Sequence, residues 1–144
     1  MKILCLDLAG STGWARAEDH FEPSCGTFSI PSHGDEIGSY LLDFETEFVA
    51  NLQRFVPDLV TYEAPSKFTS DAFITTRKLL GLQSVVMLTC ARRGLDCWSV
   101  EVNDMRKYFL APAKVPKKGK DAKDMVYEAC KARGWRPRNL DESD

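Results

Sequence analysis

The chain has 144 residues, of which 44% are hydrophobic, which is enough to bury a core and about the usual size of one domain. No apolar stretch reaches membrane-spanning length, and the N-terminus lacks the charged and apolar regions of a signal peptide. From these features we expect a soluble, intracellular protein.

The formal net charge of -2 conceals an uneven distribution. Residues 1–63 carry 3 of the 19 basic residues and 11 of the 21 acidic ones, so the positive charge is concentrated in the second half of the chain. This asymmetry favours a polyanionic partner bound to one face of the protein.

Hydrophobic patterns predict three short strands that form an antiparallel meander, at 2–8, 13–17 and 26–30. Helices and strands then alternate, in the order helix 35–55, strand 59–63, helix 70–93, strand 96–102, helix 103–109 and helix 121–133. This order predicts an α/β protein with a mixed sheet flanked by helices. No internal repeat is visible, and we expect a single domain over residues 1–144.

Two predicted buried strands end in an acidic residue. The apolar run 3–6 leads directly into Asp7, and the strand 59–62 leads into Glu63. Two further acids, Asp141 and Asp144, are three residues apart, so one helical turn would place them on the same face. Each acid alone could be a turn or surface residue. Together they indicate a site for divalent cations, because clustered carboxylates near a core need positive compensation.

The other candidate chemical groups indicate less. The five cysteines are widely spread without zinc-binding spacing, and we interpret them as core side chains. The two histidines, His20 and His33, lie in polar, turn-rich sequence far from the acids, so neither is expected to be a catalytic base.

The acids and their context resemble the RuvC-type Holliday junction resolvases. The resemblance rests on 3–15, 60–63, 67–83, 119–126 and 141–144, which cover nearly the whole chain in the expected order. It implies an RNase H-like fold and the activity of a crossover junction endodeoxyribonuclease in the cytoplasm of a bacterial or phage-infected cell. Chains of this family usually continue into a helix beyond the last acid, so we expect that helix to be absent or truncated here.

The resemblance also implies a mechanism. Two Mg²⁺ ions about 4 Å apart, replaceable by Mn²⁺, would activate water and stabilise the leaving oxygen of a phosphodiester. Asp7 would bridge the ions, and Glu63, Asp141 and Asp144 would complete their ligands. Lys123 matches the family's lysine at a helix start and would contact the scissile phosphate.

Several residues are candidates for DNA binding. Phe68, beside Lys67, matches an aromatic residue that wedges into the junction in the family, although it could equally pack under its own loop. The remaining candidates are basic residues that could bind phosphates: Arg106, Lys107, Lys117, Lys118 and Lys120. Such charge runs are often only solvated surface.

The helix predicted at 70–93 carries more apolar residues than one covered face requires. It could be a core helix buried on all sides. The resemblance implies instead that it forms a homodimer, which would present two active sites to a four-way DNA junction.

Alternative functions remain within and outside this fold family. RNase H enzymes and retroviral-type integrases cut other nucleic acids with similar acids, and a non-catalytic branched-DNA-binding module is also conceivable. The segment 7–13 is similar to the first phosphate loop of the actin and sugar-kinase superfamily, but 144 residues leave no room for its second domain.

Overall fold

The computed structural model describes residues 1–19, 21–64, 73–111 and 120–135. The chain divides into two compact units, Met1–Ser99 and Val100–Asp144, and each is described by itself. In the described ranges, no helix combines the length and the apolar character needed to cross a lipid bilayer.

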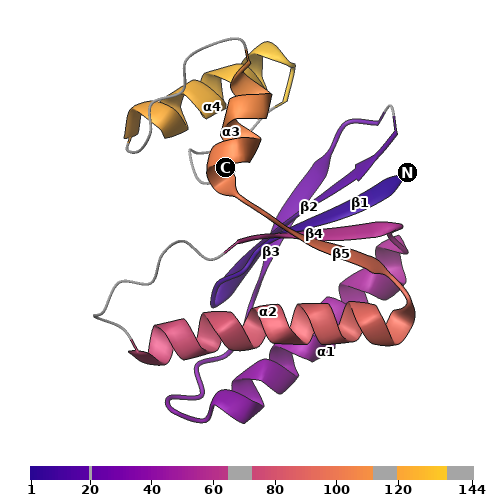
Figure 1. Cartoon of the computed structure of the whole chain (residues 1–144), viewed down its shortest axis with the longest axis vertical. Coiled ribbons are helices and arrows are strands. Elements are labelled where there is room, and N and C mark those ends of the chain that lie inside the picture. Colours follow the sequence, from indigo (N-terminus) through magenta and orange to yellow (C-terminus); the bar gives the residue numbers. More distant parts are fainter. Residues whose placement is uncertain (20, 65–72, 112–119, 136–144) are drawn as a thin grey trace. The chain divides into compact units, whose positions relative to one another are not determined.

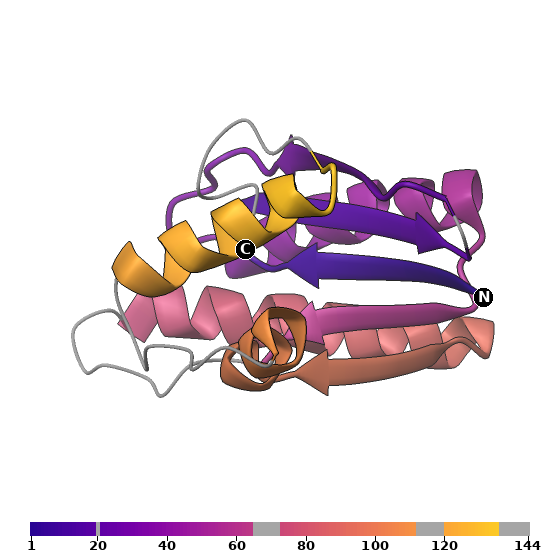
Figure 2. The same cartoon turned by 90° about the horizontal axis from the view of Figure 1, so that it is seen from above.

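The first unit contains a five-stranded mixed sheet of order β3-β2-β1-β4-β5 (Figure 1). β1 (Lys2–Asp7), β2 (Ser11–Glu18) and β3 (Ser24–Ser29) form the antiparallel meander, and β4 (Leu59–Glu63) pairs with β1 in parallel. β5 (Asp96–Val100) completes the sheet, and the arrows of β1, β4 and β5 point the same way in Figure 2. The carboxyl ends of β1 and β4 therefore meet at one edge of the sheet.

Two helices cover one face of this sheet, α1 (Ile37–Phe55) and α2 (Phe73–Arg93) (Figure 1). Side chains from two strands and both helices fill the space between them: Leu4, Leu6, Phe44, Phe48, Val60, Tyr62, Leu82 and Val86. Burying each large apolar side chain contributes roughly 1.5–3 kcal/mol, so this layer is the main source of stability in the first unit.

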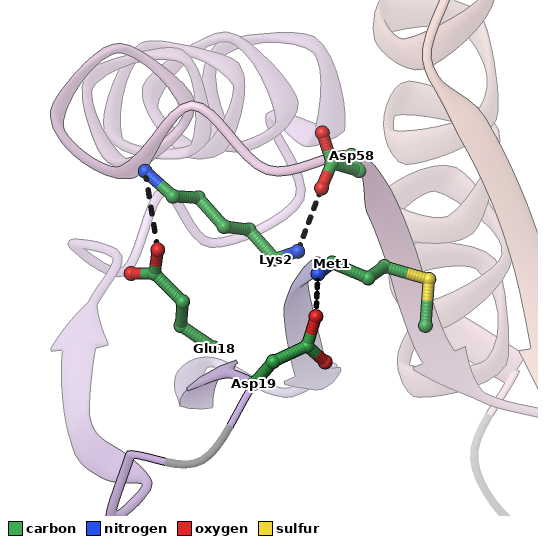
Figure 3. Close-up of polar contacts among 5 residues, drawn as sticks. All are labelled: Met1, Lys2, Glu18, Asp19 and Asp58. Atoms are coloured by element: carbon green, nitrogen blue, oxygen red, sulfur yellow. Dashed lines mark hydrogen bonds and ion pairs between the residues drawn. The ribbon is translucent and has the colours of Figure 1, made fainter.

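Asp58 joins the start of β4 to the start of β1, at the edge of the sheet opposite Asp7 and Glu63. Its carboxylate accepts a hydrogen bond from the Lys2 backbone N–H at 2.7 Å, and its own N–H donates to the Lys2 carbonyl at 2.8 Å. The same region holds the N-terminal ammonium of Met1 against Asp19 (Figure 3). Both strands are thus aligned from their first residues.

The chain reverses tightly after α2. Gly94 has a φ of +64°, which a glycine adopts without the steric cost of a Cβ. The Leu95 N–H donates to the Cys90 carbonyl at 3.0 Å and so satisfies one of the last carbonyls of the helix. The sequence prediction that Gly94 ends this helix is confirmed.

The second unit packs α3 (Val102–Leu110) against α4 (Lys120–Ala132). Leu110, Val126 and Cys130 form its buried cluster. Arg133 donates a hydrogen bond to the Phe109 carbonyl at 2.8 Å, and its guanidinium carbon lies 4.1 Å from the centre of the Phe109 ring. A stacked Trp135 covers the same ring.

The predicted fold class is confirmed: an antiparallel meander and parallel strands form one mixed sheet flanked by helices. Element bounds agree within a few residues. The interpretation of α2 as a helix buried on all sides is wrong for this chain, since Phe73, Leu80, Met87 and Leu88 are exposed. Residues 70–72 of the predicted helix lie outside the described residues.

Candidate active site

Asp7 ends β1 on the sheet face opposite the two helices. Leu4 and Leu6 are buried in the core, so the alternation along the strand directs Cys5 and Asp7 to the other face, where both are exposed. The cross-strand partner of Asp7 is Gly13, whose missing Cβ would lie 3.5 Å from the Asp7 Cβ. An added Cβ at this position would thus be in ordinary van der Waals contact with Asp7.

Glu63 stands next to Asp7 on the neighbouring parallel strand. The printed register pairs Leu6 with Tyr62, both buried, and the next residue of each strand is the acid. Neighbouring strands lie about 4.8 Å apart, so the two acids project from adjacent backbones onto the same face. The structure thus brings Asp7 and Glu63 together at one edge of the sheet.

Tyr62 secures the end of β4 immediately before Glu63. Its side chain is buried, and burial raises the pKa of its hydroxyl. The strand that carries Glu63 is therefore held by core packing.

The donor chemistry of Asp7 and Glu63 fits a hard divalent cation, because carboxylate oxygens are the ligands that Mg²⁺ and Mn²⁺ prefer. Within the described residues, no group of three or more His, Cys, Asp or Glu side chains is arranged to hold a metal. The other two predicted ligands, Asp141 and Asp144, lie outside the described residues. The four-acid site thus remains a prediction. The structure gives the positions of two of its members, Asp7 and Glu63.

Three predicted nucleic-acid contacts lie in the second unit. Lys123 is partly buried in the first turns of α4, and Arg106 is partly buried on α3. Lys107 is exposed and pairs with Asp104 at 2.8 Å. An exposed pair of this kind is weak, so Lys107 remains able to exchange its partner for a phosphate.

The other predicted contacts cannot be placed. Lys67, Phe68, Lys117 and Lys118 lie outside the described residues, and Lys120 begins α4 with its side chain undescribed. Their proposed roles remain predictions.

The first unit also contains a cavity lined by a lysine, which the sequence does not predict. Gly10, Ser32, Tyr40 and Thr75 line a cavity of about 260 Å³ together with Lys78. The Lys78 ammonium donates to the Gly34 carbonyl at 2.9 Å and lies 5.0 Å from the centre of the Tyr40 ring. No spacing in the sequence indicates this group, because it joins α2, α1 and two turns of the sheet.

Comparisons with known proteins identify similarity in structure but not in sequence. No protein-family model and no curated protein match the chain. Among solved structures, the chain is similar to Thermus thermophilus RuvC in complex with a Holliday junction substrate, with a TM-score of 0.68 and 14% identity over 100% of this chain and 87% of RuvC. A second structure of Thermus thermophilus RuvC gives a TM-score of 0.65 and 15% identity over 99% of this chain and 89% of RuvC.

A eukaryotic protein has the same fold. The yeast mitochondrial Holliday junction resolvase Ydc2 gives a TM-score of 0.67 and 14% identity, over 95% of this chain and 64% of Ydc2. The alignments to RuvC and Ydc2 include nearly all of this chain, so the similarity is not confined to one motif. The resemblance seen in the sequence is confirmed in the structure, and the chain has the fold of the RuvC-type Holliday junction resolvases.

Proposed function

We propose that this protein is a metal-dependent endonuclease that cuts four-way DNA junctions and related branched DNA by phosphodiester hydrolysis. The observation that carries the proposal is the adjacency of Asp7 and Glu63 at the carboxyl ends of the parallel strands β1 and β4. This arrangement presents two oxygen donors on an open sheet face, in a fold shared with junction resolvases.

Asp7 and Glu63 are the residues that would hold Mg²⁺ or Mn²⁺, with Asp141 and Asp144 as additional ligands. Such ions, when bound, lower the pKa of a coordinated water and offset the negative charge that develops on a phosphate in hydrolysis. Asp7 and Glu63 project from a rigid ladder, so they would orient the site without rearrangement of the backbone.

The remaining chemistry is phosphate binding. Lys123 is the first candidate to bind the scissile phosphate, and Arg106 and Lys107 would contact the DNA backbone. The RuvC structure described above contains a Holliday junction substrate, and we extend that substrate class to this chain. Sixteen of the 19 basic residues follow Glu63, which agrees with a polyanionic partner.

A homodimer would match the symmetry of a four-way junction. α2 carries exposed Phe73, Leu80 and Met87 at intervals of seven residues, with Leu88 beside them. A seven-residue repeat of apolar side chains is typical of helices that pack against a second helix. We therefore propose that two copies associate through α2 and nick opposing strands in a paired reaction.

The direct test is cleavage of a synthetic, end-labelled four-way junction with Mg²⁺ or Mn²⁺, beside linear duplex and an RNA–DNA hybrid of the same sequence. We expect nicks confined to the junction, and we expect Asp7→Asn or Glu63→Gln to reduce cleavage by at least about 100-fold. The matched control is Glu18→Gln, an exposed carboxylate at the opposite end of the sheet, which should cleave at the wild-type rate.

A second readout separates metal binding from catalysis. A ligand that binds only the folded state raises the melting temperature, so Mn²⁺ should stabilise the wild-type protein and Glu18→Gln but not Asp7→Asn. Junction cutting that persists in Asp7→Asn contradicts the proposal. Preferential cutting of the hybrid would instead identify an RNase H-type nuclease, and binding without cutting would identify a branched-DNA-binding module.

A further inference from the structure

Three hydroxyl side chains lie on the same sheet face as Asp7, on the two strands next to β1. Gly13 pairs with Asp7 on one side and with Thr27 on the other, so Thr27 lies in the same cross-strand row as the acid. Ser11 pairs with Ser29 two residues away on each strand. Because side chains alternate along a strand, all these positions belong to one face of the sheet.

The exposure of these residues supports this orientation. Thr27 and Ser29 are exposed, whereas Phe28 between them packs against the core cluster. Ser11 is likewise exposed, and the next residue, Thr12, is completely buried. The three hydroxyls therefore lie on the face opposite α1 and α2, which is the face of the candidate active site.

Two of the hydroxyls form a hydrogen-bonded pair. The Ser29 hydroxyl donates to that of Ser11 at 3.2 Å. A serine hydroxyl both accepts and donates, so the Ser11 proton can be donated to an acceptor outside the pair. Accepting a hydrogen bond also polarises a hydroxyl and strengthens it as a donor. Phosphate oxygens are suitable acceptors, and Ser and Thr side chains are among the groups that contact them in protein–DNA complexes.

The surroundings of the hydroxyls are nearly uncharged. Alternation along β1, β2 and β3 assigns the following residues to this face: Ile3, Cys5, Asp7, Ser11, Gly13, Ala15, Ala17, Cys25, Thr27 and Ser29. Asp7 is the one charged residue among these described positions. The interpretation of Cys5 and Cys25 as core side chains is wrong, since both are exposed.

This composition is unusual for a solvated edge of a sheet. β3 is an edge strand, and such strands are commonly protected by charged side chains or proline, which β3 lacks between Ser24 and Ser29. A lysine or arginine at these positions would compete with a metal ion for the Asp7 carboxylate. Neutral hydroxyls donate to a phosphate without that competition.

We propose that Ser11, Thr27 and Ser29 bind a phosphate of the DNA strand that is cut, close to the cleavage site. This inference rests on the proposed function and names a further contact with the same substrate. Two strand spacings separate the backbones of Thr27 and Asp7 by roughly 9–10 Å. DNA rises about 3.4 Å per nucleotide, so the bound phosphate lies about three nucleotides from the scissile one. The hydroxyls hold the strand and take no part in hydrolysis.

Variants that remove the hydroxyls test this role. Thr27→Val keeps the size and the strand preference of threonine, and Ser11→Ala/Ser29→Ala removes the hydrogen-bonded pair. In cleavage of the four-way junction, each variant should raise KM about tenfold and leave kcat unchanged, because a hydrogen bond to a charged phosphate is lost in substrate binding alone.

Two control variants separate the hydroxyl from its position. Thr27→Ser retains the hydroxyl and should retain the wild-type KM. Ser24→Ala removes an exposed hydroxyl from the same strand, and Ser24 pairs with Arg16 on the face that α1 and α2 cover. This variant should also keep the wild-type KM.

A single methylphosphonate in the cut strand locates the bound phosphate. This group removes one negative charge, and it can be moved one nucleotide at a time away from the cleavage site. Junction binding is measured by fluorescence anisotropy in the Glu63→Gln background, in which cleavage is slow. A methylphosphonate about three nucleotides from the cut should weaken binding about tenfold, and adding Thr27→Val should abolish this sensitivity.

The outcomes distinguish this proposal from the proposed function. If the wild-type protein cuts junctions while Thr27→Val and Ser11→Ala/Ser29→Ala keep its KM, the hydroxyl site is overturned and the nuclease stands. A methylphosphonate scan without a sensitive position near the cut also overturns the site, and this result needs no change at Thr27. A wild-type protein that neither binds nor cuts junctions overturns both.

Discussion

Lys2 and Asp58 are joined by two hydrogen bonds. The Lys2 N–H donates to the Asp58 carboxylate (Figure 3), and the Asp58 N–H donates to the Lys2 carbonyl. Asp7 follows Lys2 by five residues, and Glu63 follows Asp58 by five residues. Equal spacing from a shared starting contact places the two acids side by side at the far ends of β1 and β4. The pair at one end of the two strands thus lies in the same register as the candidate active site at the other end.

Asp58→Ala should lower the free energy of unfolding by about 1–2 kcal/mol, because it removes a charged hydrogen-bond acceptor at a position that water can reach. The remaining ladder still fixes the register, so junction cleavage at low temperature should be retained. Urea denaturation followed by circular dichroism measures the loss.

The control for this variant is Glu18→Ala. Its carboxylate lies 3.9 Å from the Lys2 ammonium, and both side chains are substantially exposed (Figure 3). Exposed pairs contribute about 0–1 kcal/mol, so this variant should be nearly neutral. Equal losses in the two variants would contradict a specific role for Asp58.

Gly26→Ala should destabilise the meander by about 1–3 kcal/mol. Trp14 is paired with Gly26 across β2 and β3, and an added Cβ would lie 2.5 Å from Cζ2 of the indole. The indole is rigid and already holds the Arg16 guanidinium at 4.2 Å from its ring centre, so it cannot move without disturbing that contact. A thermal melt of the variant measures the effect.

Gly38→Ala is the matched control. Gly38 lies exposed in the first turn of α1, and an added Cβ would meet nothing within 4 Å. Alanine is favoured over glycine in a helix by about 0.5–1 kcal/mol, so this variant should be slightly stabilised. If both substitutions lower the melting temperature equally, steric conflict with Trp14 is not the cause.

The elements that the sequence predicts best are those specified by their own residues. The strand Leu59–Glu63 has the predicted bounds because an apolar run ends in an acid, and α2 ends where Gly94 allows a positive φ. β2 begins at Ser11 instead of Gly13, since pairing with Ser29 on β3 extends a segment of weak intrinsic strand preference. Where the local preference for a strand is weak, pairing with a neighbouring strand determines where the strand begins.

In the candidate site, too, features specified by local sequence could be predicted and features that depend on tertiary contacts could not. Its strand-borne acids could be predicted, because each follows a recognisable buried strand. The Asp58 contact with Lys2 could not, since it depends on residues that meet only after the chain folds. Asp58 precedes a strand like any turn residue.

Asn51→Ala should cost about 2 kcal/mol of stability. Asn51 is buried on α1 and accepts a hydrogen bond from the Arg16 guanidinium at 2.6 Å, while its amide donates to the Glu47 carbonyl at 3.0 Å. Burial lowers the pKa of Arg16, which shows that its charge is partly desolvated between Trp14 and Phe55. Loss of the acceptor removes a hydrogen bond to a charged group, worth about 1.5–3 kcal/mol.

Two further variants identify the source of that cost. Asn51→Asp keeps an acceptor opposite Arg16 and should retain more stability than Asn51→Ala. Arg16→Met with Asn51→Leu removes both polar groups, and replacing both partners by apolar groups can be nearly neutral. A double variant as unstable as Asn51→Ala alone would show that packing, not the hydrogen bond, sets the penalty.

Leu80→Glu and Met87→Glu should each shift the protein toward a monomer. Both residues are exposed on α2 and belong to the seven-residue repeat of the proposed dimer face. Removing one such buried contact costs roughly 1.5–3 kcal/mol, which corresponds to an increase in the dimer Kd of about 10- to 100-fold. Sedimentation equilibrium measures the Kd directly.

The control for the dimer is Leu42→Glu, because Leu42 is 63% exposed on α1 and outside the repeat. This variant should keep the wild-type Kd and melting temperature, so a change in association can be attributed to α2 and not to an added charge. Monomeric variants should still nick a junction but should lose the pairing of nicks on opposing strands, since each copy carries its own Asp7 and Glu63. A wild-type protein that is monomeric at all concentrations, with paired nicks, would contradict the role of α2.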